Sequence, residues 1–124
     1  MMQNLLLVGL GGSAGAMARY AMGLGIHRLT GPGFPLAILS ANVLGSFLMG
    51  LFVVLAAHRG LTHLSPLVAT GLLGGFTTFS AFSLEAVTLW ERGATGQALA
   101  YVLASVGLSI AALVAGLGLG RALA

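Results

Sequence analysis

The chain has 124 residues, of which 58% are hydrophobic and 6% are charged, and its formal net charge is +3. A soluble domain carries about 25% charged residues because its surface must stay hydrated. Five arginines and two glutamates cannot cover a water-facing surface of this size, so the composition predicts an integral membrane protein and excludes an enzyme with an ordinary soluble catalytic domain. The arginines stand singly, which argues against nucleic acid as a partner, because nucleic-acid binding needs a clustered basic patch.

A helix that spans a bilayer needs about 20 mostly apolar residues. Four such stretches follow one another, at about residues 5–26, 35–57, 65–90 and 95–119, separated by short polar breaks. Pro35 and Ser65-Pro66 suit the start of the second and third helices. The first four residues include no basic residue, so we expect the first stretch to be a retained helix rather than a signal peptide. The prediction is one all-α, multi-pass transmembrane domain over residues 1–124.

The third stretch contains residues that form helices poorly in the middle of a span. Gly74 and Gly75 are followed by Thr77 and Thr78, and glycine and threonine both rank low in helix propensity. A break here frees carbonyl oxygens, which are hard ligands suited to a cation such as Na⁺. The alternative is a continuous, glycine-rich packing helix. We predict a break in the third helix.

Phe76, Phe79 and Phe82 recur every three residues and so share one face of the third helix. Such a stripe is ordinarily part of a core. The edges of aromatic rings are electropositive, however, and edges that face a passage can contact an anion without placing a charge in it.

Polar side chains also lie deep in the second and fourth stretches. Asn42 sits in the middle part of the second, and its amide can either hold helices together or donate hydrogen bonds to an anion. Tyr101, Ser105 and Ser109 are spaced by four and share one face of the fourth helix. A membrane serine often bonds back to its own helix, but three hydroxyls on one stripe favour a polar track.

Small residues are placed for close helix packing. Helices in lipid associate through backbone contact at small residues, and the chain contains 20 glycines. Gly11 and Gly15, and likewise Gly116 and Gly120, have the spacing of such contacts. They predict tight packing within the subunit or between subunits.

The arginines give little orientation bias. With four spans, Arg59 and Arg121 lie on one side of the membrane, and Arg28 and Arg92 lie on the other, with Arg19 near it. Because lysine and arginine in short loops set orientation, a balanced chain should insert both ways, and two opposite copies can pair about an axis in the membrane plane. The alternative is that Arg19 tips the balance toward one orientation.

Three segments together resemble the CrcB/Fluc fluoride channel family. They are Gly-Gly-Ser-Ala-Gly-Ala-Met-Ala-Arg-Tyr at 11–20, Asn-Val-Leu-Gly-Ser-Phe at 42–47 and Gly-Gly-Phe-Thr-Thr-Phe-Ser-Ala-Phe-Ser-Leu-Glu at 74–85. The match follows the whole chain in order. The resemblance implies an antiparallel, dual-topology homodimer in the cell (inner or plasma) membrane, which exports fluoride passively from the cytoplasm through two pores and holds a structural Na⁺ at the dimer interface.

The resemblance also implies roles for single residues. The backbone carbonyls of Gly74 and Thr77 would bind the Na⁺. The residues of the fluoride pathway would be Asn42, Phe79, Phe82, Tyr101, Ser105, Ser109 and Arg19.

Two features of the sequence are not explained by this resemblance. The family often has Gly-Thr where this chain has Ala37-Ile38, so a polar contact near Asn42 is either missing or supplied by Ser40. Glu85 lies about two turns before the end of its helix, where an unpaired carboxylate is costly, and the sequence names no partner for it.

Two other functions fit the same length and number of spans. A small dual-topology multidrug-type transporter relies on an acidic residue in its first helix, and this first helix has none. A non-transporting membrane structural subunit would leave the asparagine and phenylalanine pattern unexplained. We therefore favour a fluoride channel, in which neutral donors and ring edges replace the water around the ion while keeping its binding reversible.

Overall fold

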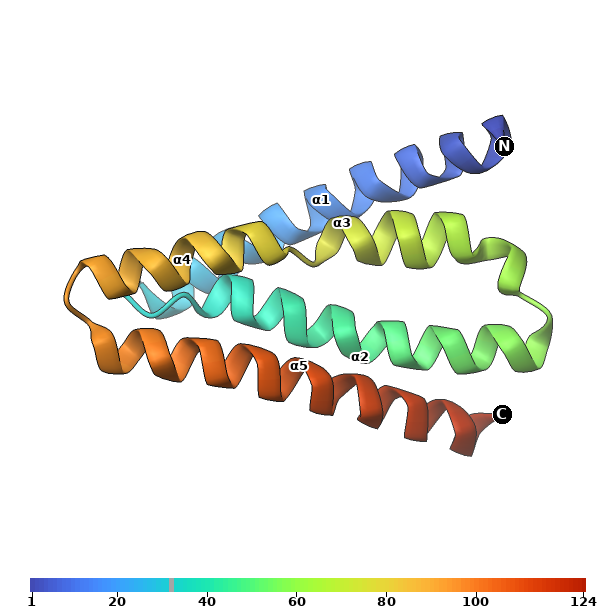
Figure 1. The fold of residues 1–124 in the computed structure, drawn as a ribbon. Coiled ribbons are helices and arrows are strands. Elements are labelled where there is room, and N and C mark those ends of the chain that lie inside the picture. The colour runs from blue at the N-terminus through green and yellow to red at the C-terminus, as the bar shows by residue number, and fades with distance from the viewer. Residues whose placement is uncertain (32) are drawn as a thin grey trace.

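The structure is a computed structural model that describes residues 1–31 and 33–124, and every regular element within them is helical (Figure 1). Four long helical stretches are apolar enough to cross a membrane: Met2–Thr30, Leu36–Arg59, Thr62–Glu91 and Thr95–Leu123. The predicted all-α, four-span class is confirmed. The elements in chain order are α1 (Met2–Thr30), α2 (Leu36–Arg59), η1 (Thr62–Leu64), η2 (Pro66–Leu73), α3 (Gly74–Phe76), α4 (Phe79–Glu91) and α5 (Thr95–Leu123).

The helices extend beyond most of the predicted boundaries. The first was expected at about 5–26 and runs from Met2 to Thr30, while the fourth was expected to end near 119 and continues to Leu123. Continuing the helix pairs backbone groups that would otherwise lie unpaired near lipid, so the helices include polar residues at their ends. Pro66 takes the first helical position as expected, but the Ser65 side chain makes no capping hydrogen bond, and the short 3₁₀ turn η1 precedes it.

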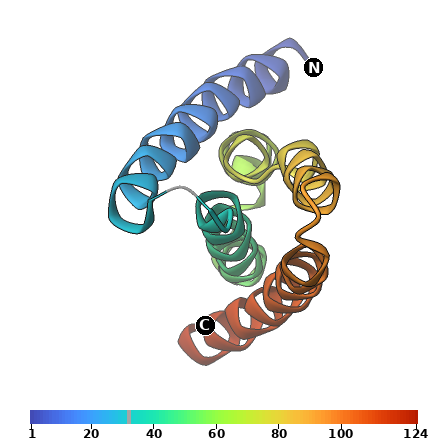
Figure 2. The same ribbon diagram turned by 90° about the vertical axis from the view of Figure 1, so that its left-hand side faces the viewer.

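The four spans run side by side, and both termini lie at the same end of the bundle (Figure 1). In the end-on view, α2 occupies the centre, while α1 and α5 lie on opposite sides of it (Figure 2). The broken third span closes the space between α1 and α5 along one side of α2. This arrangement places α2, the break and the middle of α5 around one common space.

Glycines make the close contacts that hold α1 on the third span. A side-chain carbon added at Gly11 would collide with the carbonyl of Leu67, and one added at Gly15 would collide with the carbonyl of Leu72. The backbone of Gly75 also lies against Gly12 of α1. The predicted role of the Gly11–Gly15 pair is confirmed as packing within the subunit.

The second pair packs α5 on α2. A side-chain carbon at Gly116 would collide with the carbonyl of Phe47, and one at Gly120 would lie 2.9 Å from the Cβ of Val54. On α2, Gly50 approaches the backbone of α5 in the same way, at Leu113. These contacts bring α2 and α5 together along one side of the common space.

The third span is broken, as predicted, but the break follows the glycines instead of including them. Gly74 is helical, with φ −64° and ψ −36°, and α3 continues to Phe76. Thr77 and Thr78 are extended, with ψ of 154° and 122°. The predicted break is therefore confirmed. Within that segment Gly75 supplies close packing against α1, while the threonines form the break itself.

Candidate functional site: a polar pocket beside the broken helix

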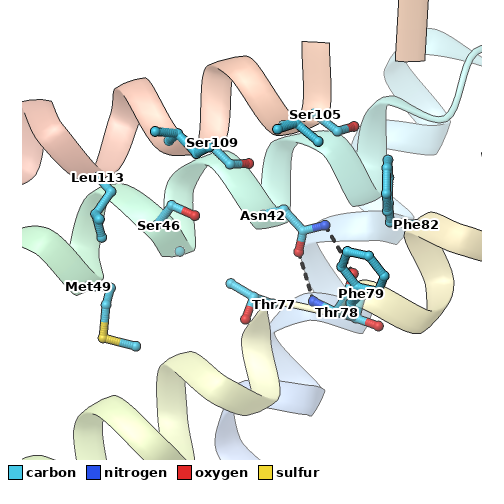
Figure 3. Close-up of a pocket in the computed structure, with 13 residues that line it drawn as sticks. Asn42, Ser46, Met49, Thr77, Thr78, Phe79, Phe82, Ser105, Ser109 and Leu113 are labelled. Atoms are coloured by element: carbon cyan, nitrogen blue, oxygen red, sulfur yellow. Dashed lines mark hydrogen bonds between the residues drawn. The ribbon is translucent and has the colours of Figure 1, made fainter. Parts of the chain in front are cut away.

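A pocket of about 340 Å³ opens between α2, the break and α5 (Figure 3). None of the described residues that line it is charged. Its polar and aromatic lining consists of Asn42, Ser46, Thr77, Thr78, Phe79, Phe82, Ser105 and Ser109. Its apolar lining includes Met49, Val106, Ile110 and Leu113. The pocket therefore offers neutral hydrogen-bonding groups and aromatic rings within a helical bundle that is apolar enough to span a membrane.

Asn42 holds the break in place. Its side-chain Oδ1 accepts a hydrogen bond from the backbone N–H of Thr78 at 2.7 Å, and its Nδ2 donates to the carbonyl of the same residue at 3.0 Å (Figure 3). The Thr78 hydroxyl in turn accepts from the N–H of Ala81 at 3.2 Å and caps the start of α4. An asparagine of one helix thus replaces helical hydrogen bonds that the third span gives up.

These bonds divert two donors that a continuous helix would use. In an α-helix the N–H of Thr78 would bond the carbonyl of Gly74, and the N–H of Ala81 would bond the carbonyl of Thr77. Here the first donates to Asn42 and the second to the Thr78 hydroxyl. The carbonyls of Gly74 and Thr77 therefore lose their helical donors. These are the two carbonyls that the family resemblance implied as Na⁺ ligands.

Phe79 and Phe82 begin α4 and both line the pocket. Their ring centroids lie 5.4 Å apart at an interplanar angle of 60°. Phe79 is 77% exposed in the single chain, whereas Phe82 is 8% exposed. Phe76, on the same sequence stripe, is buried and is absent from the lining of this pocket, so only two of the three rings face it.

The three polar residues of the fourth span do not all face the same space. Ser105 and Ser109 line the pocket, and the Oγ of Ser105 is buried without a hydrogen-bond partner among the described residues. Tyr101 is fully buried and lies outside the pocket lining, with its ring 5.3 Å from Phe82. Its hydroxyl donates to Oε2 of Glu85 at 3.3 Å, which supplies the partner that the sequence did not name.

Glu85 borders a second pocket, of about 320 Å³, beside the start of α2 and the end of α4. His27 and Arg92 also line this pocket, as does Phe34, whose ring meets Tyr101 edge-on at 5.6 Å. Tyr101 contacts Phe82 of the first pocket and both Phe34 and Glu85 of the second. Tyr101 therefore links residues of the two pockets, although it lines neither of them.

Arg19 lies away from the first pocket. Its Nε donates to the carbonyl of Gly75 at 3.4 Å, next to the carbonyls that the break leaves without helical donors. At the departure from the family pattern, Ala37 lines the second pocket, and Ile38, one turn before Asn42 on α2, packs on the buried cluster around Phe82; neither side chain offers Asn42 a polar contact. Ser40 makes no hydrogen bond with Asn42 within the described part of the chain.

The described residues hold no cluster of the side chains that commonly bind metal ions. Across residues 1–31 and 33–124, no three His, Cys, Asp or Glu side chains come together to hold a metal ion.

The sequence profile of CrcB-like proteins (Camphor Resistance, CrcB) matches residues 6–117. The chain belongs to this family. It is 65% identical over 122 residues to the fluoride-specific ion channel FluC of Roseobacter denitrificans, with 97% of each chain covered. It is 76% identical over 95 residues to the FluC of a Jannaschia species, covering 77% of this chain and 90% of the relative. The FluC of Paracoccus denitrificans is 56% identical over 123 residues, covering 99% and 98% of the two chains.

In this CrcB-like chain, the structure gathers most of the residues predicted for the site. Asn42, Phe79, Phe82, Ser105 and Ser109 line one pocket, Tyr101 packs on Phe82 beside it, and Arg19 lies away from it at the carbonyl of Gly75. Sequence reasoning missed Ser46, although its position four residues after Asn42 places both on one face of α2. The Tyr101–Glu85 bond had no local signal, because the two residues are 16 positions apart.

Proposed function

We propose that this chain forms a fluoride-specific ion channel that lets fluoride leave the cytoplasm passively across the cell membrane. The names and identities of its relatives support this function. The observation that carries it is the neutral pocket, where an amide, hydroxyls and ring edges line a space without a charged side chain. A fixed cation would hold fluoride too tightly, and conduction needs binding that is favourable yet reversible.

The pathway follows from the order of these groups. Phe79 and Phe82 present electropositive ring edges, and Ser105 and Ser109 continue the polar lining along α5. Tyr101 packs on Phe82 of this pocket and donates to Glu85 of the second one, so the route would continue past Tyr101 toward the second pocket. None of the described groups along this route couples the movement of fluoride to an energy source, which fits passive movement down a gradient.

The working unit is an antiparallel homodimer with dual topology. Phe79 is largely exposed in the single chain although it lines the pocket, and a second copy packed on this side would enclose it. The balance of Arg59 and Arg121 against Arg28 and Arg92 supports insertion in both orientations.

A structural Na⁺ fits the break. Each subunit offers the carbonyls of Gly74 and Thr77, whose helical donors are taken by Asn42 and the Thr78 hydroxyl. Four neutral carbonyls from two subunits suit a monovalent cation better than a divalent one, which proteins usually compensate with carboxylates. When bound, the ion supplies a fixed positive charge that holds the two breaks together.

Fluoride efflux from liposomes that contain only this protein tests the channel function. We expect rapid efflux down the gradient, without a proton gradient and with little chloride efflux. Efflux that depends on a proton gradient and carries organic cations would favour a multidrug-type transporter. A protein that assembles normally but releases no fluoride would favour a structural subunit.

The Na⁺ proposal has a separate readout. Purified dimer is heated in NaCl and in N-methylglucamine chloride of equal ionic strength, with MgCl₂ as the divalent comparison. We expect a higher melting temperature and slower subunit dissociation in NaCl than in either N-methylglucamine chloride or MgCl₂. Equal values in all three salts would overturn the proposal.

A further inference from the structure

Ser46 is a pocket-lining residue to which neither the sequence pattern nor the proposed pathway assigns a role. It lies one helical turn after Asn42 on α2, and both side chains line the 340 Å³ pocket. In the close-up, Ser46 sits between Asn42 and Met49 along α2, and Ser109 of α5 lines the same space (Figure 3). Its position therefore continues the polar wall that Asn42 begins.

The hydroxyl of a serine or threonine inside a membrane helix usually donates back to the carbonyl four residues earlier. Four hydroxyls outside this pocket do so, with oxygen–oxygen distances between 2.7 and 3.0 Å. They belong to Ser13, Thr30, Ser83 and Thr88. These hydroxyl protons are engaged within their own helices and are not available to an ion.

Ser46 differs from these residues. Within the described residues its hydroxyl makes no bond to the carbonyl of Asn42 or to any other group, and the same holds for Ser105 and Ser109 across the pocket. Ser105 gives the strongest case, because its Oγ is fully buried and has no partner. A buried hydroxyl without a partner is costly, so Ser105 points to a ligand that accepts hydrogen bonds in this pocket. Ser46 and Ser109 are half-buried and line the same space, so their hydroxyls are also available to such a ligand.

We propose that the Ser46 hydroxyl is a further fluoride contact, on the wall of α2 that faces the serines of α5. This inference rests on the proposed channel function and extends its pathway. An anion that has passed Asn42 then receives neutral donors from two helices at once, Ser46 from one and Ser105 or Ser109 from the other. Met49 and Leu113 line the same pocket and offer no donor, which confines the ion to the hydroxyl-lined part.

The test compares fluoride efflux from liposomes for Ser46→Thr and Ser46→Val. Thr and Val have nearly the same shape, so this pair differs in the hydroxyl alone. We expect the Thr variant to conduct close to the wild-type rate and the Val variant to conduct about two- to tenfold more slowly, the range that corresponds to one neutral hydrogen bond. Ser46→Ala should be slowed by a similar factor. Ser83→Ala is the matched control, because Ser83 does not line the pocket and its hydroxyl donates to the backbone carbonyl of Phe79 in its own helix.

Two further measurements keep the result unambiguous. Melting temperatures of the four variants should agree with the wild type, since Ser46 makes no bond that folding needs. In the Ser46→Ala/Ser109→Ala double variant, the two losses should not multiply if both hydroxyls hold the same ion. Equal efflux from Ser46→Val and Ser46→Thr, with wild-type efflux intact, overturns the role of Ser46. Absence of efflux from the wild type instead overturns the channel function itself.

Discussion

The side chain of Asn42 and the peptide group of Thr78 form two hydrogen bonds with each other, at 2.7 and 3.0 Å. The pair joins the middle of α2 to the break in the third span, 36 residues away. Without these bonds the backbone N–H and carbonyl of Thr78 would lie unpaired in the membrane interior. Asn42 therefore offsets the free-energy cost of breaking the helix. The carbonyl of Gly74 loses its helical donor as a consequence, and that of Thr77 loses its own because the Thr78 hydroxyl accepts from the N–H of Ala81.

Replacing Asn42 by Ala should therefore destabilise the protein before it affects any ion. The variant leaves the N–H and carbonyl of Thr78 unpaired, at a cost of about 2–4 kcal/mol. We expect a clearly lower melting temperature in detergent and loss of the Na⁺-dependent part of the stability. Ser40→Ala, on the same helix, is the control and should melt like the wild type. Wild-type melting of Asn42→Ala would show that the break is held by other contacts.

Replacing Phe79 and replacing Phe82 should have different effects on stability but similar effects on conduction. Phe82→Ile removes a buried ring that packs on Tyr101 and should cost about 1 kcal/mol, whereas Phe79→Ile changes an exposed side chain of the subunit. Both swaps remove an electropositive ring edge, and we expect fluoride efflux at least about tenfold slower in each, equivalent to about 1.4 kcal/mol of barrier. Phe76→Leu is the control for efflux. Unchanged efflux from Phe82→Ile would assign that ring to the core alone.

The contact between α2 and α5 should depend on Gly116 and not on Gly118. An alanine at Gly116 meets the carbonyl of Phe47, while one at Gly118 meets nothing within 4 Å. Overpacking costs about 1–3 kcal/mol, so Gly116→Ala should lower the melting temperature and Gly118→Ala should leave it unchanged or raise it. Thermal melting of the two purified variants decides this. Equal melting temperatures for the two variants would contradict a tight contact between α2 and α5 at Gly116.

Orientation should respond to two added charges. Two lysines inserted after Gly60 bias that loop and both termini toward the cytoplasm. We expect a single topology by labelling of introduced cysteines, and little fluoride efflux from this variant alone. Co-expression with a variant that carries two lysines after Gly93 should restore efflux. Full efflux from the first variant by itself would contradict an antiparallel pair.

The features that could be predicted from the sequence are those that local residue patterns determine. Four apolar stretches and their polar ends gave the spans, and the spacing of the hydroxyls on α5 placed Ser105 and Ser109 in one lining. The break was predicted for the right segment, but not which of its residues leave the helix, because helix propensity does not reveal that Gly75 is needed against Gly12 or that the Thr78 hydroxyl can cap α4.

Pairs distant in sequence could not be predicted at all. The bonds from Asn42 to Thr78 and from Tyr101 to Glu85 depend on how the spans are placed around α2, which no periodicity encodes. The same holds for Ser46, whose free hydroxyl becomes noticeable only beside hydroxyls that bond back to their helices.

The π-helix η2, over Pro66–Leu73, affects how the chain tolerates a change in length. Each turn of a π-helix closes a hydrogen bond over five residues, one more than an α-helix. Losing one residue there lets a turn revert to the α form, so Thr77 and Thr78 keep their orientation toward Asn42. The same deletion in α2 would rotate everything after it by about 100° and turn the following pocket residues away. Single-residue deletions in the two helices, compared by dimer yield and melting, should show η2 to be the more permissive.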